Sequence, residues 1–360
     1  MMLRVLWHKG LLQILRAVTG SLTLQEAVDK YIRAAHADNT HDSYGTAVRR
    51  YARFGREEDR PNLFPASDKV LCEFAAYLAE ESLAYRTIKG YLFGVRHAQL
   101  TMGLEFPTLE GRYTLQMVLR GILRTIGDVR KPKMPITLKL LRQFALEVQK
   151  LRRDAAKRVL WGAIWAAILV GFFAMLRKDN ITKGKKGSLN ERQGLKRSDV
   201  RFCAATRTRP AIMWLRLRYS KTNQSWQAPL IIPVAATGDD LCPVRAVKNH
   251  LAETTGGPED NLFLAKRTAK PGAKQVPLPH TGLVTGIKTL AQAAGVDPKK
   301  YSGHSLRRGG ATMAFQLGLR SHLIQNQGGW RGDSVFLYNE LTAADRLELP
   351  TLMAKATIAG

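Results

Sequence analysis

Two short stretches near the C-terminus combine side chains that could act on a phosphate group. The first is YSGHSLRRGGAT, from Tyr301 to Thr312, in which His304 and Arg307 are three residues apart. Residues at this spacing share one face of a helical turn, so both side chains could contact a single phosphate. The pair alone is a weak signal, because a chain with eight histidines and this much arginine should contain about one H-x-x-R by chance. The second stretch, GGWRGDSVFLY, ends at Tyr338 and adds a phenol to the same region.

The charge of the chain favours a large polyanionic partner. The 360 residues contain 56 Lys and Arg against 29 Asp and Glu, for a formal net charge of +27. So positive a chain repels itself unless a polyanion neutralises it, which makes nucleic acid the first candidate partner and an anionic membrane surface the second. Small acidic substrates rarely need such an excess. Since 45% of the residues are apolar, the chain can bury a sizeable core, and its length favours two domains.

The three cysteines and one long apolar run indicate the redox environment of the chain and whether it enters a membrane. Cys72, Cys203 and Cys242 lie far apart with no zinc-ligand pattern, so we expect buried thiols in a reducing compartment, without disulfides or a metal site. The run VLWGAIWAAILVGFFAML, residues 159–176, is 18 residues long and uncharged, which just meets the length of a membrane span. Its flanks are basic on both sides, and it would be a solitary span. We therefore favour a buried central helix and keep a membrane-anchored basic protein as a third interpretation.

Apolar periodicity and helix breakers predict a helical N-terminal domain over residues 21–127. Thr23 and Glu26 form a capping box that opens its first helix, which runs to about Ala35. Residues 1–20 form a leader, which we expect to be disordered although it faintly resembles a transit peptide. Four further helices are expected at about 43–54, 68–80, 85–102 and 113–125.

A linker separates this domain from a larger one. Residues 128–136 are charged, contain two prolines and lack an apolar period. The second domain covers residues 137–360 and opens with a helix capped by Thr137. From Ala211 the pattern changes to period two, so strands at 211–219 and 228–234 should form a β-hairpin with Lys221 at or near its turn.

Two groups of basic residues have open interpretations. On the expected helix at 85–102, Arg86, Lys89 and Arg96 lie opposite an apolar face. Such a face is commonly solvated, but the excess charge makes a DNA-facing role about equally good. The run from Lys183 to Lys186 could be a nuclear import signal, or a loop that is solvated or faces phosphates.

With these elements in order, the sequence resembles the tyrosine recombinase (phage integrase) family. That family carries an Arg after a buried helix, a Lys on a β-hairpin, H-x-x-R, a His or Trp, and a Tyr nucleophile near the C-terminus. The matching positions occur in the same order: Arg177 in GFFAMLRKDN, Lys221 in YSKTNQ, His304 and Arg307 in HSLRRGGAT, and Trp330 and Tyr338 in GGWRGDSVFLYNE.

The motifs LRKDNI, SKTNQ, LCPVRAV and SGHSLRRGGAT resemble most closely the recombinases of DIRS-like and Ngaro-like eukaryotic retroelements, over nearly the whole chain from about residue 21. The resemblance implies a mainly α fold with a small antiparallel β-sheet. It also implies a two-domain architecture, with a helical core-binding domain followed by a mixed α/β catalytic domain.

The resemblance gives each matching residue a role in phosphodiester cleavage, and the residue types suit those roles. Arg177 and Arg307 would hold the non-bridging oxygens through forked hydrogen bonds, with His304 as a third donor. Tyr338 would attack the phosphorus, and Lys221 would protonate the departing 5′ oxygen as a general acid.

Simpler interpretations stay open for several of these residues. Arg177 could cap the dipole of the preceding helix, Lys221 could be an ordinary turn lysine, and Tyr338 could be a packing residue. Trp330 stands eight residues before Tyr338, whereas many family members have the His or Trp nine residues before, a position that is Gly329 here. Core packing is therefore the alternative role for Trp330.

Taken together, these features predict an enzyme that cleaves and rejoins DNA strands through a 3′-phosphotyrosine intermediate, in site-specific recombination or the integration of a mobile element. The expected partner is double-stranded DNA, and the resemblance implies a homotetramer on two DNA sites and a nuclear location. No metal, cofactor, membrane or small-molecule substrate is expected. The alternative is a domesticated or inactive DNA-binding protein that keeps the fold without strand exchange, which the complete set of catalytic residue types disfavours.

Overall fold

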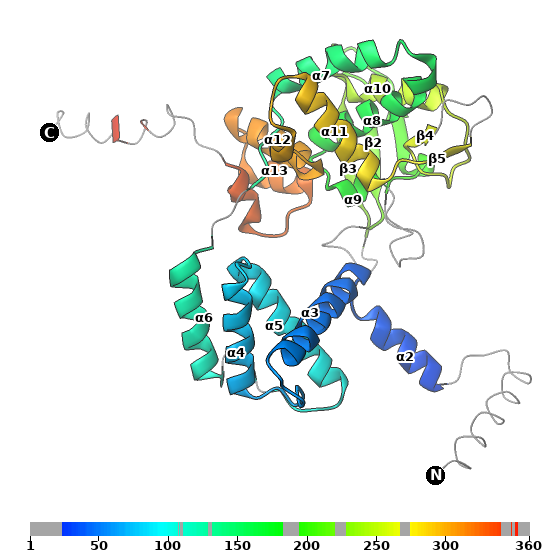
Figure 1. Ribbon diagram of the computed structural model, residues 1–360. Helices are drawn as coiled ribbons and strands as arrows, with labels where there is room; N and C mark the ends of the chain where they lie inside the picture. Colours follow the sequence, from blue (N-terminus) through cyan, green and yellow to red (C-terminus); the bar gives the residue numbers. More distant parts are fainter. Residues whose placement is uncertain are drawn as a thin grey trace, which may run out of the picture. The chain divides into compact units, whose positions relative to one another are not determined.

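The chain divides into two compact units, Met1–Arg130 and Lys131–Gly360, both drawn in Figure 1. The boundary falls within the expected linker at 128–136. The computed structural model describes residues 24–106, 108, 111–128, 132–182, 194–219, 228–266, 274–339, 347, 350 and 351. The expected leader and Thr23 of the expected capping box lie outside the described residues.

The described part of the first unit is helical, as predicted. Its elements are α2 (Leu24–Ala34), α3 (Asp38–Glu57), α4 (Asp68–Glu80), α5 (Tyr85–Thr101) and α6 (Tyr113–Ile126). Helix α3 begins five residues before the expected start at residue 43, because its first turn contains no apolar residue that would extend the periodic pattern. The core of the unit includes Tyr51, Phe54, Leu71 and Phe74, all fully or almost fully buried.

Helix α5 packs closely against α3. A Cβ atom at Gly94 would overlap the Cβ of Ala47, so glycine permits this close approach. The expected apolar face of α5 is buried through Ile88, Leu92 and Val95. The opposite face carries polar and charged residues together with one exposed phenylalanine of the helix.

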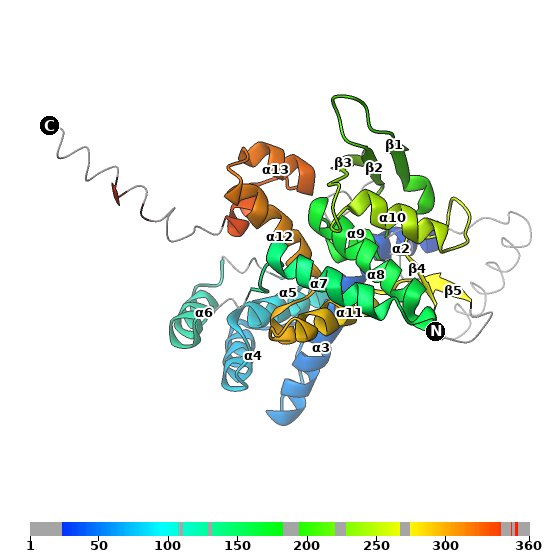
Figure 2. The ribbon, with the colours of Figure 1, turned by 90° about the horizontal axis from the view of Figure 1, so that it is seen from above.

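The second unit is built around α8 (Ala155–Phe173). Every residue from Trp161 to Phe172 is buried, and helices α7 (Leu138–Leu151), α10 (Pro243–Ala252), α11 (His280–Ala293) and α12 (Gly303–Gln316) pack against α8 (Figure 2). By length and composition, α8 is the single helix among the described residues that could cross a membrane. Its burial confirms the prediction of a central core helix. Thr137 caps α7 as expected, since its side chain accepts a hydrogen bond from the Leu140 amide.

The β-structure is small and antiparallel. Strands β1 (Val200–Cys203), β2 (Ile212–Leu217) and β3 (Leu230–Ala235) form one sheet in that order, with Leu215 opposite Ile232. The pairing of β2 with β3 confirms the predicted pairing of the two period-two segments. Strand β1 and the two-stranded sheet of β4 (Leu264–Lys266) and β5 (Gln275–Pro277) were not expected from the sequence, because runs of three or four residues are too short to establish an alternation.

The fold class is thus the expected one, mainly helical with small antiparallel sheets. The cysteine prediction was correct only in part: Cys242 is buried, but Cys72 and Cys203 are half-buried. Cys242 has a local role at the start of α10, where its sulfur accepts a hydrogen bond from the Arg245 amide.

Candidate active site

Arg177 stands at the end of the central helix, but not directly after it as expected. Helix α8 ends at Phe173, and the next residues form a turn in which Met175 has a φ of +49°. This turn brings the chain to Arg177, the half-buried N-cap residue of the short helix α9 (Lys178–Ile181). An arginine at a helix N-terminus does not neutralise the dipole of that helix, so Arg177 has no favourable dipole interaction with α9, and its interpretation as a cap of α8 stays open.

Helix α12 carries both His304 and Arg307. The Ser302 side chain accepts a hydrogen bond from the His304 amide, which starts the helix at this point. The Arg307 side chain is only 1% exposed, and its Nη1 donates to the carbonyl oxygens of Met175 at 2.6 Å and Gly328 at 2.7 Å. One arginine therefore joins the turn before Arg177 to the end of α13 (Ser321–Gly328).

The other two nitrogens of the Arg307 guanidinium are not used by these carbonyl oxygens. Nε and Nη2 are buried and have no hydrogen-bond partner among the described residues. Burial lowers the pKa of Arg307 to about 9, and the charge of Arg177 acts in the same direction, whereas Tyr338 opposes the shift. The side chain remains cationic at neutral pH, so these two donors form a positive fork suited to the oxygens of a phosphate.

Trp330, and not Gly329, supplies a side chain at this point. Gly329 ends α13 in the left-handed conformation with a φ of +64°. The Trp330 side chain is buried, and its ring centroid lies 3.5 Å from the guanidinium carbon of Arg307, a cation–π contact. Any Cβ atom at Gly328 would overlap this indole, so the stacking depends on a glycine there. Trp330 thus packs in the core and contacts Arg307 at the same time.

Tyr338 reaches this site from the same chain. It is the last residue of the 3-10 helix η5 (Asp333–Tyr338), and its hydroxyl lies 3.1 Å from Nε2 of His304. Its ring centroid is 5.4 Å from that of Trp330. Partial burial lowers the pKa of His304, as do the neighbouring charges of Arg307, Arg308 and Arg177. A neutral imidazole can accept the phenolic proton, so the pair has the arrangement of a base and a nucleophile.

Two residues that the sequence analysis did not assign also contact Tyr338. The guanidinium of Arg308 lies 5.9 Å from the centre of the Tyr338 ring, and the Thr312 hydroxyl donates to the Tyr338 carbonyl oxygen at 3.0 Å. Both belong to the motif that contains His304 and Arg307, which was the available signal. Their type alone did not reveal which part of the chain they would meet.

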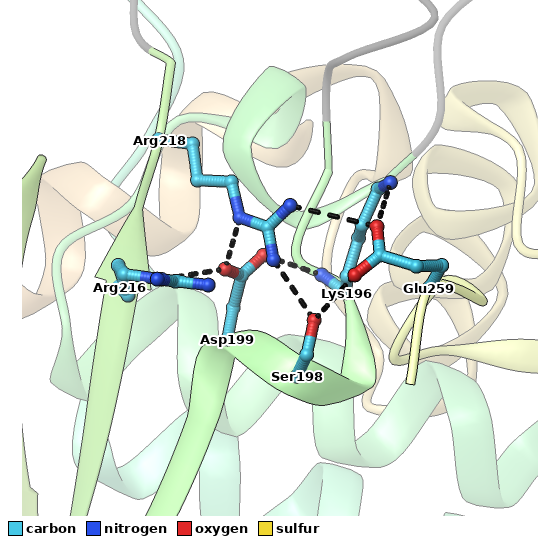
Figure 3. A network of polar contacts seen from close by, with 6 residues as sticks. All are labelled: Lys196, Ser198, Asp199, Arg216, Arg218 and Glu259. Carbon is cyan, nitrogen blue, oxygen red and sulfur yellow. Dashed lines mark hydrogen bonds and ion pairs between the residues drawn. The ribbon is translucent and has the colours of Figure 1, made fainter. Parts of the chain in front are cut away.

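Lys221 lies outside the described residues, but a polar network fixes the strand end that precedes it (Figure 3). The buried carboxylate of Asp199 accepts hydrogen bonds from Nε of Arg216 at 3.1 Å and from Nε of Arg218 at 2.6 Å. Arg218 also donates to Ser198, and Glu259 binds Lys196 at 2.6 Å. These contacts join the end of β2 to η3 (Arg197–Asp199) and to the loop before β4.

The expected DNA-facing residues of the first unit lie on the outer side of α5. Arg86 is exposed and forms an ion pair with Asp128 at 2.7 Å. Lys89 is exposed, with its Nζ 6.0 Å from the centre of the Tyr85 ring. Arg96 is half-buried and forms no ion pair with another described residue. The run from Lys183 to Lys186 lies outside the described residues. Within the described residues, no group of three or more His, Cys, Asp and Glu side chains could hold a metal ion.

Comparisons with known proteins extend this picture. No protein-family model matches the chain. An "Integrase/recombinase xerD homolog" from Selenomonas ruminantium is 22% identical over 303 residues, which cover 82% of this chain and 79% of that protein. Among solved structures, the XerH site-specific recombinase bound to difH in a post-cleavage complex matches with a TM-score of 0.58 and 16% identity, over 87% of this chain and 79% of that chain.

Two integrase structures match in the same way. The Tn1549 transposon integrase in complex with transposon right end DNA has a TM-score of 0.57 and 16% identity, over 91% of this chain and 98% of that chain. A lambda integrase dimer bound to a COC′ core site has a TM-score of 0.51 and 16% identity, over 91% of this chain and 79% of that chain. The chain has the tyrosine recombinase fold. The sequence match and this fold together support the tyrosine recombinase/integrase family that the motifs indicated.

Within the tyrosine recombinase fold of this chain, the second unit brings five of the six predicted residues together. His304 and Arg307 lie on α12, Trp330 and Tyr338 follow α13, and Arg177 begins α9 close enough to lower the pKa of both His304 and Arg307. The likeness to the retroelement branch stays a prediction from the motifs.

Proposed function

We propose that this chain cleaves and rejoins DNA strands, with Tyr338 as the nucleophile. The observation that carries the proposal is the contact at 3.1 Å between the Tyr338 hydroxyl and Nε2 of His304, beside the buried cation of Arg307. Homology to site-specific recombinases supports DNA cleavage and rejoining in recombination. The geometry of the site supports the assignment of this reaction to Tyr338, His304 and Arg307.

The reaction is an in-line displacement at phosphorus. His304 accepts the phenolic proton, the Tyr338 oxygen forms a bond to phosphorus, and the bond from phosphorus to the 5′ oxygen breaks. Arg177 and Arg307 stabilise the negative charge that develops on the non-bridging oxygens. The departing 5′ oxygen takes a proton from Lys221, the general acid that the sequence predicts. The product is a 3′-phosphotyrosine and a free 5′-hydroxyl.

Rejoining is the same reaction in reverse. The phosphotyrosine bond retains the energy of the original phosphodiester, so a 5′-hydroxyl from another strand can displace Tyr338 without a further energy source. An exchange of strands follows when the second 5′-hydroxyl comes from a different duplex. This is the chemistry that site-specific recombination requires.

The wider setting of the reaction follows from the sequence and the relatives. The solved relatives are described with difH, transposon end or core-site DNA, which supports double-stranded DNA as the partner of this chain. The motifs shared with DIRS-like and Ngaro-like retroelement recombinases favour the integration of a mobile element in a nucleus. Four chains on two duplexes would then form the exchanging complex.

A trapping assay tests the proposed function. Purified protein is incubated with nicked duplexes of varied sequence and with duplexes that carry a 5′-bridging phosphorothiolate, then denatured and separated by size. We expect a covalent protein–DNA adduct with the wild-type chain and none with Tyr338→Phe. Salt-sensitive DNA binding without an adduct on any duplex would instead favour a DNA-binding protein that keeps the fold without strand exchange.

A further inference from the structure

Thr312 makes an unusual contact for a threonine inside a helix. Its side chain is 6% exposed in the middle of α12, and its hydroxyl donates to the carbonyl oxygen of Tyr338 at 3.0 Å. Tyr338 is 8% exposed and ends a 3-10 helix, so its carbonyl has no partner within that helix. A buried carbonyl without a partner is costly, and the Thr312 hydroxyl removes that cost.

Other helical threonines of this chain use their hydroxyl differently. Thr46 in α3 donates to the Asp42 carbonyl at 2.8 Å, and Thr125 in α6 donates to the Gly121 carbonyl at 2.9 Å. Both partners are four residues earlier in the same helix, the usual local bond of a threonine in a helix. The hydroxyl of Thr312 instead makes a tertiary bond to a residue 26 positions later.

Tyr338 is therefore held by α12 at two points. His304 contacts the phenolic oxygen and Thr312 the main chain, and Arg307 lies between them in the sequence. His304 and Thr312 are separated by about 12 Å along the helix axis, at about 1.5 Å per residue. A contact at the phenol alone would leave the tyrosine backbone free to shift, whereas two contacts fix both ends of the residue relative to Arg307.

The apolar packing around this segment is limited. Its cluster is separate from the main core of the unit and consists of seven buried residues: Met175, Ala311, Ala314, Ile324, Trp330, Val335 and Tyr338. Three of the seven are alanine or valine, which bury little area. In so small a cluster, one buried hydrogen bond makes a substantial contribution to the position of the segment.

We propose that Thr312 is a positioning residue for the nucleophile, whose hydroxyl fixes the main chain of Tyr338 so that the phenol meets His304 and the phosphate held by Arg307. The proposal rests on the proposed function, because Tyr338 must be the attacking group. Thr312 itself contacts neither substrate nor the reacting atoms. Misplacing a nucleophile by a fraction of an ångström slows attack without weakening the binding of DNA.

A pair of substitutions separates the hydroxyl from the shape of the side chain. Thr312→Val keeps the shape and removes the donor, while Thr312→Ser keeps the donor and removes the methyl group. We expect adduct formation to slow about tenfold in the valine variant, which corresponds to about 1.4 kcal/mol, with unchanged affinity for duplex DNA. The serine variant should stay within about twofold of the wild-type rate. Equal slowing of both variants would mean a packing role and would overturn the proposal.

Hydrogen–deuterium exchange of the free protein gives a readout that does not depend on cleavage. Amides of residues 333–339 should exchange faster in Thr312→Val than in the wild type, and at the wild-type rate in Thr312→Ser. Unchanged exchange in the valine variant overturns the positioning role. If exchange is faster in the valine variant but the wild-type chain forms no adduct, Thr312 does position Tyr338. In that case the proposed function is wrong and the positioning role is not.

Discussion

At the scale of single residues, Arg307 has a structural role and, in the proposed reaction, a chemical one. Its Nη1 atom satisfies two backbone carbonyls, and its guanidinium lies against the Trp330 ring. Its Nε and Nη2 atoms are buried without a hydrogen-bond partner among the described residues, and in the proposed reaction they would bind the oxyanion. Because one side chain does both, a substitution at Arg307 changes folding and chemistry together and is a poor probe of either.

His304 is a cleaner probe of the chemistry. Burial and three arginines hold its pKa below the ordinary value of about 6.5, so the neutral, proton-accepting form persists to lower pH. We predict that the rate of adduct formation is constant around neutral pH and falls once the pH drops below this lowered pKa. In His304→Gln the rate should be about 10² to 10⁴ times lower, and this acidic decline should be absent.

Single-turnover rates of adduct formation between pH 4.5 and 8 measure both expectations. Controls at each pH should establish that the DNA stays bound. An acidic decline of the same midpoint in the glutamine variant would exclude His304 as the proton acceptor.

A second histidine links pH to stability. His250 is 1% exposed, and its Nε2 accepts a hydrogen bond from the Leu264 amide, so the neutral ring carries its proton on Nδ1. Burial lowers the pKa of His250 to about 4, and the charges of Arg197 and Arg152 act in the same direction. The unfolded chain protonates this histidine near pH 6.5, whereas the folded chain does so only near pH 4. The stability associated with the neutral, buried ring is therefore fully present above pH 6.5 and is lost as the pH falls toward 4.

We predict that the second unit loses up to about 3 kcal/mol of unfolding free energy over this pH range through His250. His250→Gln keeps an acceptor for the Leu264 amide but cannot titrate, so its stability should depend less on pH. Urea unfolding at pH 7 and pH 4.5 compares the two proteins. The same pH dependence in both would contradict the assignment to His250.

At the scale of elements, the contact between α8 and α12 sets the geometry of the site. A Cβ atom at Gly310 would overlap the carbonyl oxygen of Phe172, and one at Gly309 would overlap that of Ile136. Backbone atoms cannot move aside as a flexible side chain can. Gly310 therefore lets α12 approach the end of α8, and Gly309 lets it approach the segment that precedes α7, with Arg307 at the Met175 carbonyl.

We predict that Gly310→Ala lowers the unfolding free energy by about 1–3 kcal/mol or more, because the added methyl group pushes α12 away from α8. Adduct formation should fall with it. Gly90→Ala is the matched control, since no atom lies within 4 Å of a Cβ at this position in α5, and alanine there should stabilise the helix by about 0.5–1 kcal/mol. Thermal unfolding of both variants tests the difference, and equal effects would contradict the close-packing argument.

The elements also mark where sequence reasoning succeeds and where it ends. The long helices were predictable because their apolar periods are strong, and α4 matches its expected range of 68–80 at both ends. Strands β4 and β5 were not predictable, since each has three residues and depends on its partner for hydrogen bonds. Likewise the site residue types were evident from the motifs, but the Thr312 contact joins residues 26 positions apart and follows from packing that no local pattern encodes.

At the scale of the whole molecule, the net charge of +27 should dominate the affinity for DNA. Each phosphate contact releases counterions, so the affinity falls as the salt concentration rises. The logarithm of the binding constant falls against the logarithm of the salt concentration with a slope of about 0.9 per contact. If the DNA-facing interpretation of α5 is correct and Lys89 contacts a phosphate, Lys89→Ala should reduce this slope by about 1 and weaken binding to all sequences alike. Arg53→Ala is the control, because Arg53 is already paired with Glu57 at 2.6 Å and should leave the slope unchanged.

Fluorescence anisotropy with a duplex over a series of salt concentrations gives these slopes. A Lys89→Ala slope equal to that of the wild type would show that the outer side of α5 is merely solvated.

In the proposed reaction, Tyr338 attacks a phosphate that is bound by Arg177 and Arg307 of the same chain. The most direct test mixes Tyr338→Phe with Arg177→Ala chains on a duplex that the wild type cleaves, and measures the covalent adduct. If the site is complete within each chain, neither variant alone nor the mixture forms an adduct. An adduct restored by mixing would mean that the tyrosine of one chain enters the site of another, and would contradict attack within a single chain.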